Sequence, residues 1–194
     1  QPSDNRQPYM DEEGRVLNHA LATNVVARTT NQQAAVKSID NKPKQEFAPL
    51  AFSLSSLQIA AAKQYGFSAQ QVLDSCQQLY ERHQLITYPR SDCRYLPTAQ
   101  HNQAPTIIAH LSQGTEPIAS YAQQANTGLK SKTWNDKKVS AHHAIIPTEK
   151  SASSVQLSKT EALIYQLITR QFVAQFYDNY QYLQTTIVME IAVC

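Results

Sequence analysis

The sequence predicts an α+β fold, in which a mainly helical domain is inserted into a small antiparallel β arch. Two stretches far apart in the chain, Gln33–Asp40 and Tyr182–Cys194, alternate apolar and polar residues as strands do. Helix-capping patterns and helical periodicity fill the chain between them. Because pairing the two strands would make the helical middle an insertion, we expect the first part of the arch at 1–49, the helical domain at 50–157, and a return segment of helix plus strand at 158–194.

The first arch segment is expected to contain a turn at Asp11–Gly14 and a short helix that Asn18 caps and that ends near Arg28. Asn41–Pro49 is polar, contains two prolines and is expected to be a linker. At the other end, a strand that runs to Cys194 has an open edge and no terminating turn. We therefore expect the chain to be part of a longer protein.

Helix signals are strongest in the middle of the chain. Ser53 and Gly66 bound a predicted helix at Leu54–Gln64. A capping box at Ser68–Gln71 opens a second helix, expected to end near His83, whose inward face carries Val72, Leu73, Cys76, Leu79 and Tyr80. Further elements are helices at Pro97–Leu111 and Glu116–Gln124, a loop at Asn126–Lys138, and a helix from a capping box at Ser158 to about Phe176.

Composition suits a globular protein and excludes several classes. Hydrophobic residues make up 42% of the chain and aromatic residues 8%. No apolar run approaches the roughly 20 residues that span a bilayer, so we expect no membrane partner and a cytoplasmic location. The cysteines Cys76, Cys93 and Cys194 form no C-x-x-C pair, so we expect neither a disulfide framework nor a metal site in this chain. The sequence also has no glycine-rich phosphate loop.

A net charge of +2 does not by itself indicate a nucleic-acid ligand. The positive charge is nevertheless concentrated in two places. Five lysines and two histidines lie between Lys130 and Lys150, and Arg82, Arg90 and Arg94 surround Leu85–Pro97. Each group alone is more typical of a solvated face.

The stretch Leu85–Pro97 carries the first candidate for chemistry, in the order Leu-Ile-Thr-Tyr-Pro-Arg-Ser-Asp-Cys-Arg-Tyr-Leu-Pro. Tyr88 lies two residues before Arg90. A phenol with a pKa of about 10 is a poor nucleophile at neutral pH. It can attack phosphorus if a guanidinium neutralises the phosphate and stabilises the developing charge. The alternative is a tyrosine packed in the core at the end of a strand, with Arg90 paired to Asp92.

The stretch Ser140–Thr148, Ser-Ala-His-His-Ala-Ile-Ile-Pro-Thr, carries the second candidate. Adjacent histidines point in different directions on a helix or a strand, so His142 and His143 are not an obvious pair of metal ligands. One histidine beside a phosphate can donate a hydrogen bond or move a proton. The alternative is a capping or surface histidine.

Together these stretches resemble the active-site motifs of the type IA DNA topoisomerases. Leu85–Pro97, preceded by Gly66–Ala69 and Leu79–Glu81, resembles the tyrosine motif, and Ser140–Thr148 resembles the A-H-[EH]-A-I-x-P motif. The residues of these two motifs are closer to the topoisomerase III branch of the family than to the topoisomerase I branch. The resemblance covers nearly the whole chain, because three further stretches match in order: Asp11–Arg15, Pro49–Leu57 and Ser158–Phe176.

The resemblance implies roles for single residues. Tyr88 would form a 5′-phosphotyrosyl bond with one DNA strand, which is cut and rejoined so that another strand can pass. Arg90 would orient the tyrosine and bind the scissile phosphate, and His142 would hydrogen-bond a phosphate. His143 stands where topoisomerase I relatives have glutamate. On charge and position, the predicted DNA contacts are Arg94, Lys137, Lys138 and His143.

The resemblance also implies parts that this sequence does not contain. In the family, a separate domain supplies an acidic Mg²⁺ site, a lysine and a glutamate, and no D-x-D-x-E-like cluster occurs here. We therefore expect Mg²⁺ to be bound outside this chain and the remaining topoisomerase domains to be partners in cis. Single-stranded and negatively supercoiled DNA are the implied substrates. By itself, the chain is expected to be inactive in strand cleavage.

Two other functions compete with this interpretation. A site-specific recombinase requires its arginines and histidine upstream of the tyrosine, but His142 lies 54 residues after Tyr88. A non-enzymatic single-strand DNA-binding module interleaves aromatic and basic residues. Trp134 lies in such a setting, among Lys130, Lys132, Lys137 and Lys138.

Overall fold

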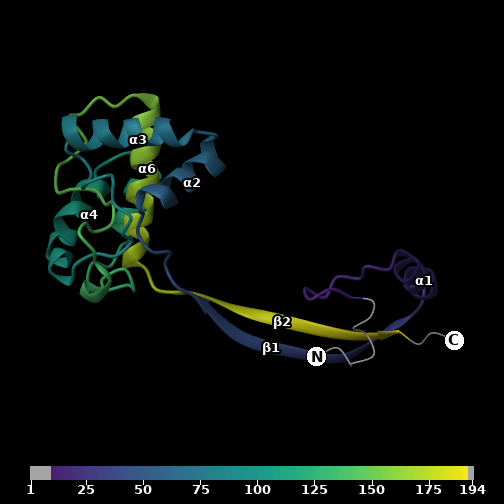
Figure 1. The fold of residues 1–194 in the computed structure, drawn as a ribbon. Coiled ribbons are helices and arrows are strands. Elements are labelled where there is room, and N and C mark those ends of the chain that lie inside the picture. The colour runs from purple at the N-terminus through teal and green to yellow at the C-terminus, as the bar shows by residue number, and fades with distance from the viewer. Residues whose placement is uncertain (1–9, 192–194) are drawn as a thin grey trace. The chain divides into compact units, whose positions relative to one another are not determined.

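The computed structural model describes residues 10–191. In it the chain forms two compact units (Figure 1). The divisions fall between residues 44 and 45 and between residues 181 and 182. The described residues form helices and one two-stranded sheet, which confirms the predicted α+β class.

The first unit is built on the sheet, in which β1 (Ala34–Glu46) pairs with β2 (Tyr180–Ile191). The predicted pairing of the two end segments is therefore confirmed. The strands run antiparallel, as two cross-strand contacts show: Lys37 with Glu190 and Asn41 with Thr185. Val193 and Cys194, which the sequence also assigned to the second strand, lie outside the described residues.

β1 is longer than the strand predicted from the sequence. It continues past Asp40 through Asn41–Glu46, which were expected to be linker. The proline in this extension, Pro43, is compatible with a strand because each strand of a two-stranded sheet has one free edge, where a missing N–H removes no ladder hydrogen bond.

α1 (His19–Thr29) begins at its predicted cap, where the Asn18 side chain accepts a hydrogen bond from the Leu21 N–H at 3.0 Å. The predicted turn before it is present, and Gly14 has a φ of 77°, a left-handed conformation that glycine adopts without steric penalty. No described residue of the first unit is buried. Its described part therefore has no apolar core.

The second unit contains the other helices. The predicted capping boxes at Ser68 and Ser158 and the predicted cap at Ser53 are present, since each of these serine side chains accepts a hydrogen bond from the third residue of the helix that follows. The α-helices are α2 (Leu54–Tyr65), α3 (Ala69–Gln77), α4 (Ala104–Ser112), α5 (Ile118–Gln123) and α6 (Lys159–Val173). Shorter turns are η2 (Gln78–Arg82), η3 (Thr98–Gln103), η4 (Asp136–Lys138) and η5 (Ala174–Phe176).

α6 is the central helix of the second unit (Figure 1). Ile164, Leu167 and Ile168 pack in an apolar cluster with α2 and α3, and Phe172 packs in a second cluster with α4 and α5. The domain boundary predicted at 157 assigns this helix to the arch. In the structure the helix lies within the helical unit, because its apolar stripe is buried against the other helices.

The buried carboxylate of Glu161 lies at the start of α6. Its burial opposes ionisation, but the hydrogen bonds of the capping box with Ser158 and the nearby His83 ring outweigh that effect and lower the pKa of Glu161. The Ser158 N–H donates to Oε2 at 2.7 Å, and His83 Nε2 lies 3.6 Å from Oε1. The ionised carboxylate therefore anchors the first turn of the central helix to the end of the helical stretch α3–η2.

This carboxylate gives a prediction about pH. Because the folded pKa of Glu161 lies below its ordinary value of 4.5, the stability that ionisation contributes is present above about pH 4.5 and is lost as the pH falls through the folded pKa. Glu161→Gln keeps the shape but not the charge. We expect it to lower the free energy of unfolding by about 1 kcal/mol at pH 7 and to have a smaller effect at pH 3.5, as measured by denaturation at both pH values. An equal effect at both would contradict the assignment.

Candidate active site

The two segments that carry the predicted motifs pair with each other at one isolated antiparallel bridge. Ile86 and Pro147 form an antiparallel bridge, and the Thr148 N–H donates to the Leu85 carbonyl at 2.9 Å. Leu85, Ile86 and Pro147 are all buried. The pairing therefore lies in the interior and holds the two motifs at a fixed register.

Thr87 makes the largest number of hydrogen bonds across this pairing. Its N–H donates to the Ile146 carbonyl at 2.9 Å. Its hydroxyl donates to the Ala144 carbonyl at 3.1 Å and accepts from the Ile146 N–H at 3.0 Å. The residue before Tyr88 is thus fixed by its backbone and its side chain to the segment that follows His142.

Neighbouring segments extend this frame on the histidine side. The Ala144 N–H donates to the Tyr95 carbonyl at 2.9 Å, and the Ile145 N–H donates to the Phe52 carbonyl at 2.8 Å. Ala144 and Ile145 are buried. The segment after His142 is therefore bonded both to the start of the tyrosine motif and to its end.

The Tyr88 side chain lies at the edge of the frame and is 37% exposed. The His142 ring lies against it, with centroids 4.4 Å apart and planes inclined by 39°. The two residues that the sequence singled out as nucleophile and phosphate-binding histidine are therefore neighbours, although 54 residues separate them in the chain.

Tyr80 is a third ring in this cluster, and it is not among the site residues predicted from the sequence. It packs edge-on against Tyr88, with centroids 5.8 Å apart and planes at 84°. The sequence placed Tyr80 on the inward face of its helix, but it is 38% exposed. The reason is that α3 is followed by the π-helical turn η2, whose wider turn shifts the side-chain positions out of the 3.6-residue pattern.

Other tyrosines are less suited to act as nucleophiles. Burial raises the pKa of Tyr165 to about 12. Burial and the neighbouring Tyr121 also raise the pKa of Tyr177, whose hydroxyl donates to the Tyr121 carbonyl at 2.6 Å. A raised pKa disfavours the phenolate that attacks phosphorus.

Arg90 and His142 are both exposed. Within residues 10–191, the structure records no hydrogen bond to the Arg90 guanidinium or to the His142 ring, so both retain their donors for a ligand. Among the described residues no ion pair joins Arg90 to Asp92, and the Asp92 carboxylate accepts from the Ser140 hydroxyl at 3.5 Å. Ser140 thereby links the loop after Tyr88 to the loop before His142.

His143 differs from His142 because both of its ring nitrogens are engaged. Nδ1 lies 2.8 Å from the Ala144 carbonyl and Nε2 lies 2.9 Å from the Gln100 amide nitrogen. The carbonyl can only accept, so Nδ1 carries the proton and Nε2 accepts from Gln100. His143 is half-buried and holds the histidine loop against η3.

The remaining predicted DNA contacts fall into two kinds. Arg94 is half-buried, and its guanidinium donates to the carbonyls of Ala51 and Leu50 at 3.0 Å each. Lys137 and Lys138 are exposed on η4, and Lys138 Nζ donates to the Tyr95 hydroxyl at 3.3 Å. Arg94 therefore ties the tyrosine motif to the chain before α2, whereas the lysines face solvent. Contact of any of them with DNA stays a prediction.

Within the described part of the chain, no three histidine, cysteine or carboxylate side chains gather closely enough to hold a metal ion. Cys76 and Cys93 are buried free thiols. None of the helices between residues 10 and 191 has the length and hydropathy needed to cross a membrane.

Sequence comparisons place these features among known proteins. The sequence pattern of the family described as DNA topoisomerase matches residues 3–194. The chain is 51% identical over 191 residues to DNA topoisomerase 3 of Vibrio cholerae, which covers 98% of this chain and 30% of that protein. It is 37% identical to DNA topoisomerase 3 of Bacillus subtilis, covering 95% of this chain and 26% of that protein. The chain thus spans less than a third of the length of these curated relatives.

A solved structure has a similar fold. The full-length topoisomerase I of Thermotoga maritima superposes with a TM-score of 0.61 over 92% of this chain and 28% of that chain. Sequence identity is 22%, so this likeness concerns the fold alone.

The Thr87 hydroxyl provides a test of the frame. Thr87→Val keeps the side-chain shape but leaves the Ile146 N–H without its side-chain acceptor, which should lower the free energy of unfolding by about 1–3 kcal/mol. Thr106→Val on the exposed face of α4 is the matched control, with an expected change within about 0.5 kcal/mol. Chemical denaturation of both variants measures the difference, and equal stability of the two would contradict the described hydrogen bonds.

Proposed function

We propose that this chain, which belongs to the DNA topoisomerase family, carries the tyrosine with which a type IA, topoisomerase III-like enzyme cuts and rejoins one DNA strand. The observation that supports the proposal most directly is the contact between the exposed Tyr88 ring and the His142 ring, 4.4 Å apart, on a frame that joins the two family motifs. Membership of this family also removes the recombinase alternative.

The reaction that suits this site is a reversible transesterification. The Tyr88 oxygen attacks the phosphorus of one phosphodiester, the bond from phosphorus to the 3′ oxygen breaks, and a 5′-phosphotyrosine forms. The phenolic proton leaves the tyrosine, and the departing 3′ oxygen takes up a proton. In the reverse direction the 3′ hydroxyl attacks the phosphotyrosine and the strand is restored, so no bond energy has to be supplied from outside.

The predicted site residues have distinct roles in this proposal. Arg90 binds the scissile phosphate, because a guanidinium presents paired donors to phosphate oxygens and balances their charge. His142 donates a hydrogen bond to a phosphate oxygen, and its ring limits the orientations of Tyr88. Lys137 and Lys138 contact the DNA backbone farther along the strand. Arg94 and His143 are predicted DNA contacts as well, although the side chains of both already make hydrogen bonds within the protein.

The Mg²⁺ that the family resemblance implies does not fit the described residues, because they form no cluster of metal ligands. We propose that the ion is held outside this chain, and the transesterification is described from residues of this chain alone. The other topoisomerase domains are the proposed partners in cis, and single-stranded or negatively supercoiled bacterial DNA in the cytoplasm is the proposed substrate. Passage of a second strand through the cut would change DNA topology.

The proposal is tested in the full-length protein that contains this chain. Tyr88→Phe should abolish covalent capture of a labelled single-stranded oligonucleotide on denaturing gels, a loss of at least about 10³-fold, because phenylalanine has no nucleophilic oxygen. Tyr121→Phe, which alters another exposed tyrosine of the same unit, is the matched control and should capture DNA as the parent does. Capture that survived in Tyr88→Phe would assign the nucleophile elsewhere.

A further inference from the structure

A pocket of about 410 Å³ lies within the helical unit. This volume falls in the usual range for sites that hold a small molecule or one unit of a polymer. We call it the aromatic–lysine pocket, after the side chains that dominate its lining: Phe47, Tyr95, Trp134, Lys132 and Lys138.

The two lysines of the pocket lie over two of its rings. Lys132 Nζ is 3.1 Å from the centroid of Phe47, and Lys138 Nζ is 5.0 Å from the centroid of Tyr95. Such contacts hold a flexible ammonium group in place without neutralising it. None of the lining residues is acidic, and the nearby Asp136 directs its carboxylate to Thr98 at 2.5 Å and 2.9 Å. The pocket therefore presents fixed positive charge next to aromatic surface.

Trp134 adds a donor to this lining. It is 7% exposed, and its indole N–H has no hydrogen-bond partner among the described residues. A buried donor without an acceptor is unfavourable. An occupant that brought an oxygen or nitrogen acceptor to this indole would remove that penalty.

Hydrogen bonds connect the pocket to the frame of the candidate active site. Tyr95, in the pocket, is bonded through its carbonyl to Ala144, whose own carbonyl accepts from Thr87. Lys138 is joined to the tyrosine motif through its carbonyl, which accepts from the Cys93 thiol at 3.4 Å. The pocket and Tyr88 are therefore attached to one hydrogen-bonded frame.

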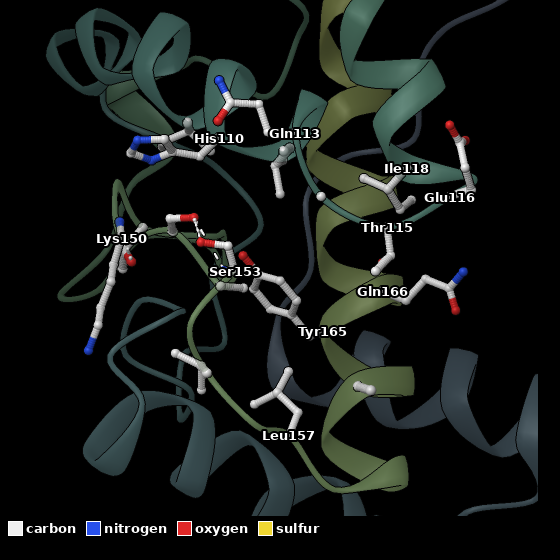
Figure 2. A pocket seen from close by; sticks show the side chains of 18 of the residues that line it. His110, Gln113, Thr115, Glu116, Ile118, Lys150, Ser153, Leu157, Tyr165 and Gln166 are labelled. Atoms are coloured by element: carbon white, nitrogen blue, oxygen red, sulfur yellow. Dashed lines mark hydrogen bonds between the residues drawn. The ribbon is translucent and has the colours of Figure 1, made fainter.

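A second pocket, of about 570 Å³, has a different character (Figure 2). Figure 2 shows Lys150 and His110 on one side of it and Glu116 and Gln166 on the other, with the Tyr165 ring between them. Its lone lysine is matched by a carboxylate, and no described cation–aromatic pair lines it. Its charge is balanced, so this pocket does not favour a polyanion. Lys150 is therefore a suitable control position for the lysines of the aromatic–lysine pocket.

We propose that the aromatic–lysine pocket is a subsite for one nucleotide of the single DNA strand, with the base against the part of the exposed Phe47 ring that Lys132 does not cover and the phosphate beside Lys132 and Lys138. Aromatic rings stack with any base and ammonium groups balance the backbone, which is the combination that single-strand binding requires. The inference rests on the proposed function, because it concerns the strand that Tyr88 attacks.

The test uses the full-length protein with Tyr88→Phe, so that covalent capture does not contribute to binding. A fluorescent single-stranded oligonucleotide is titrated, together with versions in which one base at a time is replaced by an abasic site. Phe47→Leu should weaken binding of the complete oligonucleotide by about 5-fold or more. In the parent, an abasic site at one position of the oligonucleotide should weaken binding. In Phe47→Leu, the same abasic site should cause no further loss of affinity.

Lys132→Gln should reduce the slope of log Kd against log salt by about 0.7, the value for one phosphate contact on a single strand. Lys150→Gln, the control, should keep the parent's affinity and slope. The proposal is overturned if Phe47→Leu and Lys132→Gln bind like the parent while melting at the same temperature. It is also overturned if Phe47→Leu weakens every oligonucleotide equally, abasic versions included, because that result excludes contact with a particular base.

The two proposals can fail separately. If the protein with an intact Tyr88 captures DNA and the pocket variants bind like the parent, only the subsite is wrong. If the intact protein captures no DNA, the proposed reaction is wrong, and the abasic scan still decides whether the pocket binds a base.

Discussion

The pairing of Leu85–Thr87 with Ala144–Thr148 is the interaction on which the candidate active site depends. It joins segments that are distant in the sequence, and Thr87 fixes it with three hydrogen bonds that involve its backbone and its hydroxyl. Tyr88 follows directly after one segment and His142 precedes the other. Their contact is therefore a consequence of the register of this pairing, and a shift of one residue would turn the side chains to opposite faces.

The helical core makes that pairing rigid. Ile86 and Ile145 are buried in the same cluster as the apolar residues of α2, α3 and α6. Tyr88 is thus attached to a packed interior, while its ring, Arg90 and His142 remain exposed. This arrangement suits a site that has to admit a large polyanion to a tyrosine held in one orientation.

Features set by local interactions could be predicted from the sequence. The caps at Asn18, Ser53, Ser68 and Ser158 depend on residues three positions away, and the structure shows each of them. Features set by tertiary contacts could not. The capping box at Ser158 identifies α6 as a helix, but its place in the helical unit depends on which residues its apolar stripe meets.

The same distinction holds for the site. From residue chemistry alone, Tyr88 could also be a core tyrosine and His142 a capping or surface histidine. The resemblance to the family motifs is what predicted that both belong to one site. The engagement of Arg94 with the carbonyls of Leu50 and Ala51 has no local signal, since more than forty residues separate the partners. Tyr80 was placed inward because a regular 3.6-residue period was assumed, whereas the π-helical turn changes the face on which it lies.

Amide hydrogen exchange of Thr87 and Ile146 in the full-length protein tests the central claim most directly. Both N–H groups donate across the pairing, so both should be protected to the same degree as the buried helices of the unit and should become exposed only when that unit unfolds. Rapid exchange of these two amides while α6 stays protected would show that the pairing does not hold Tyr88 beside His142.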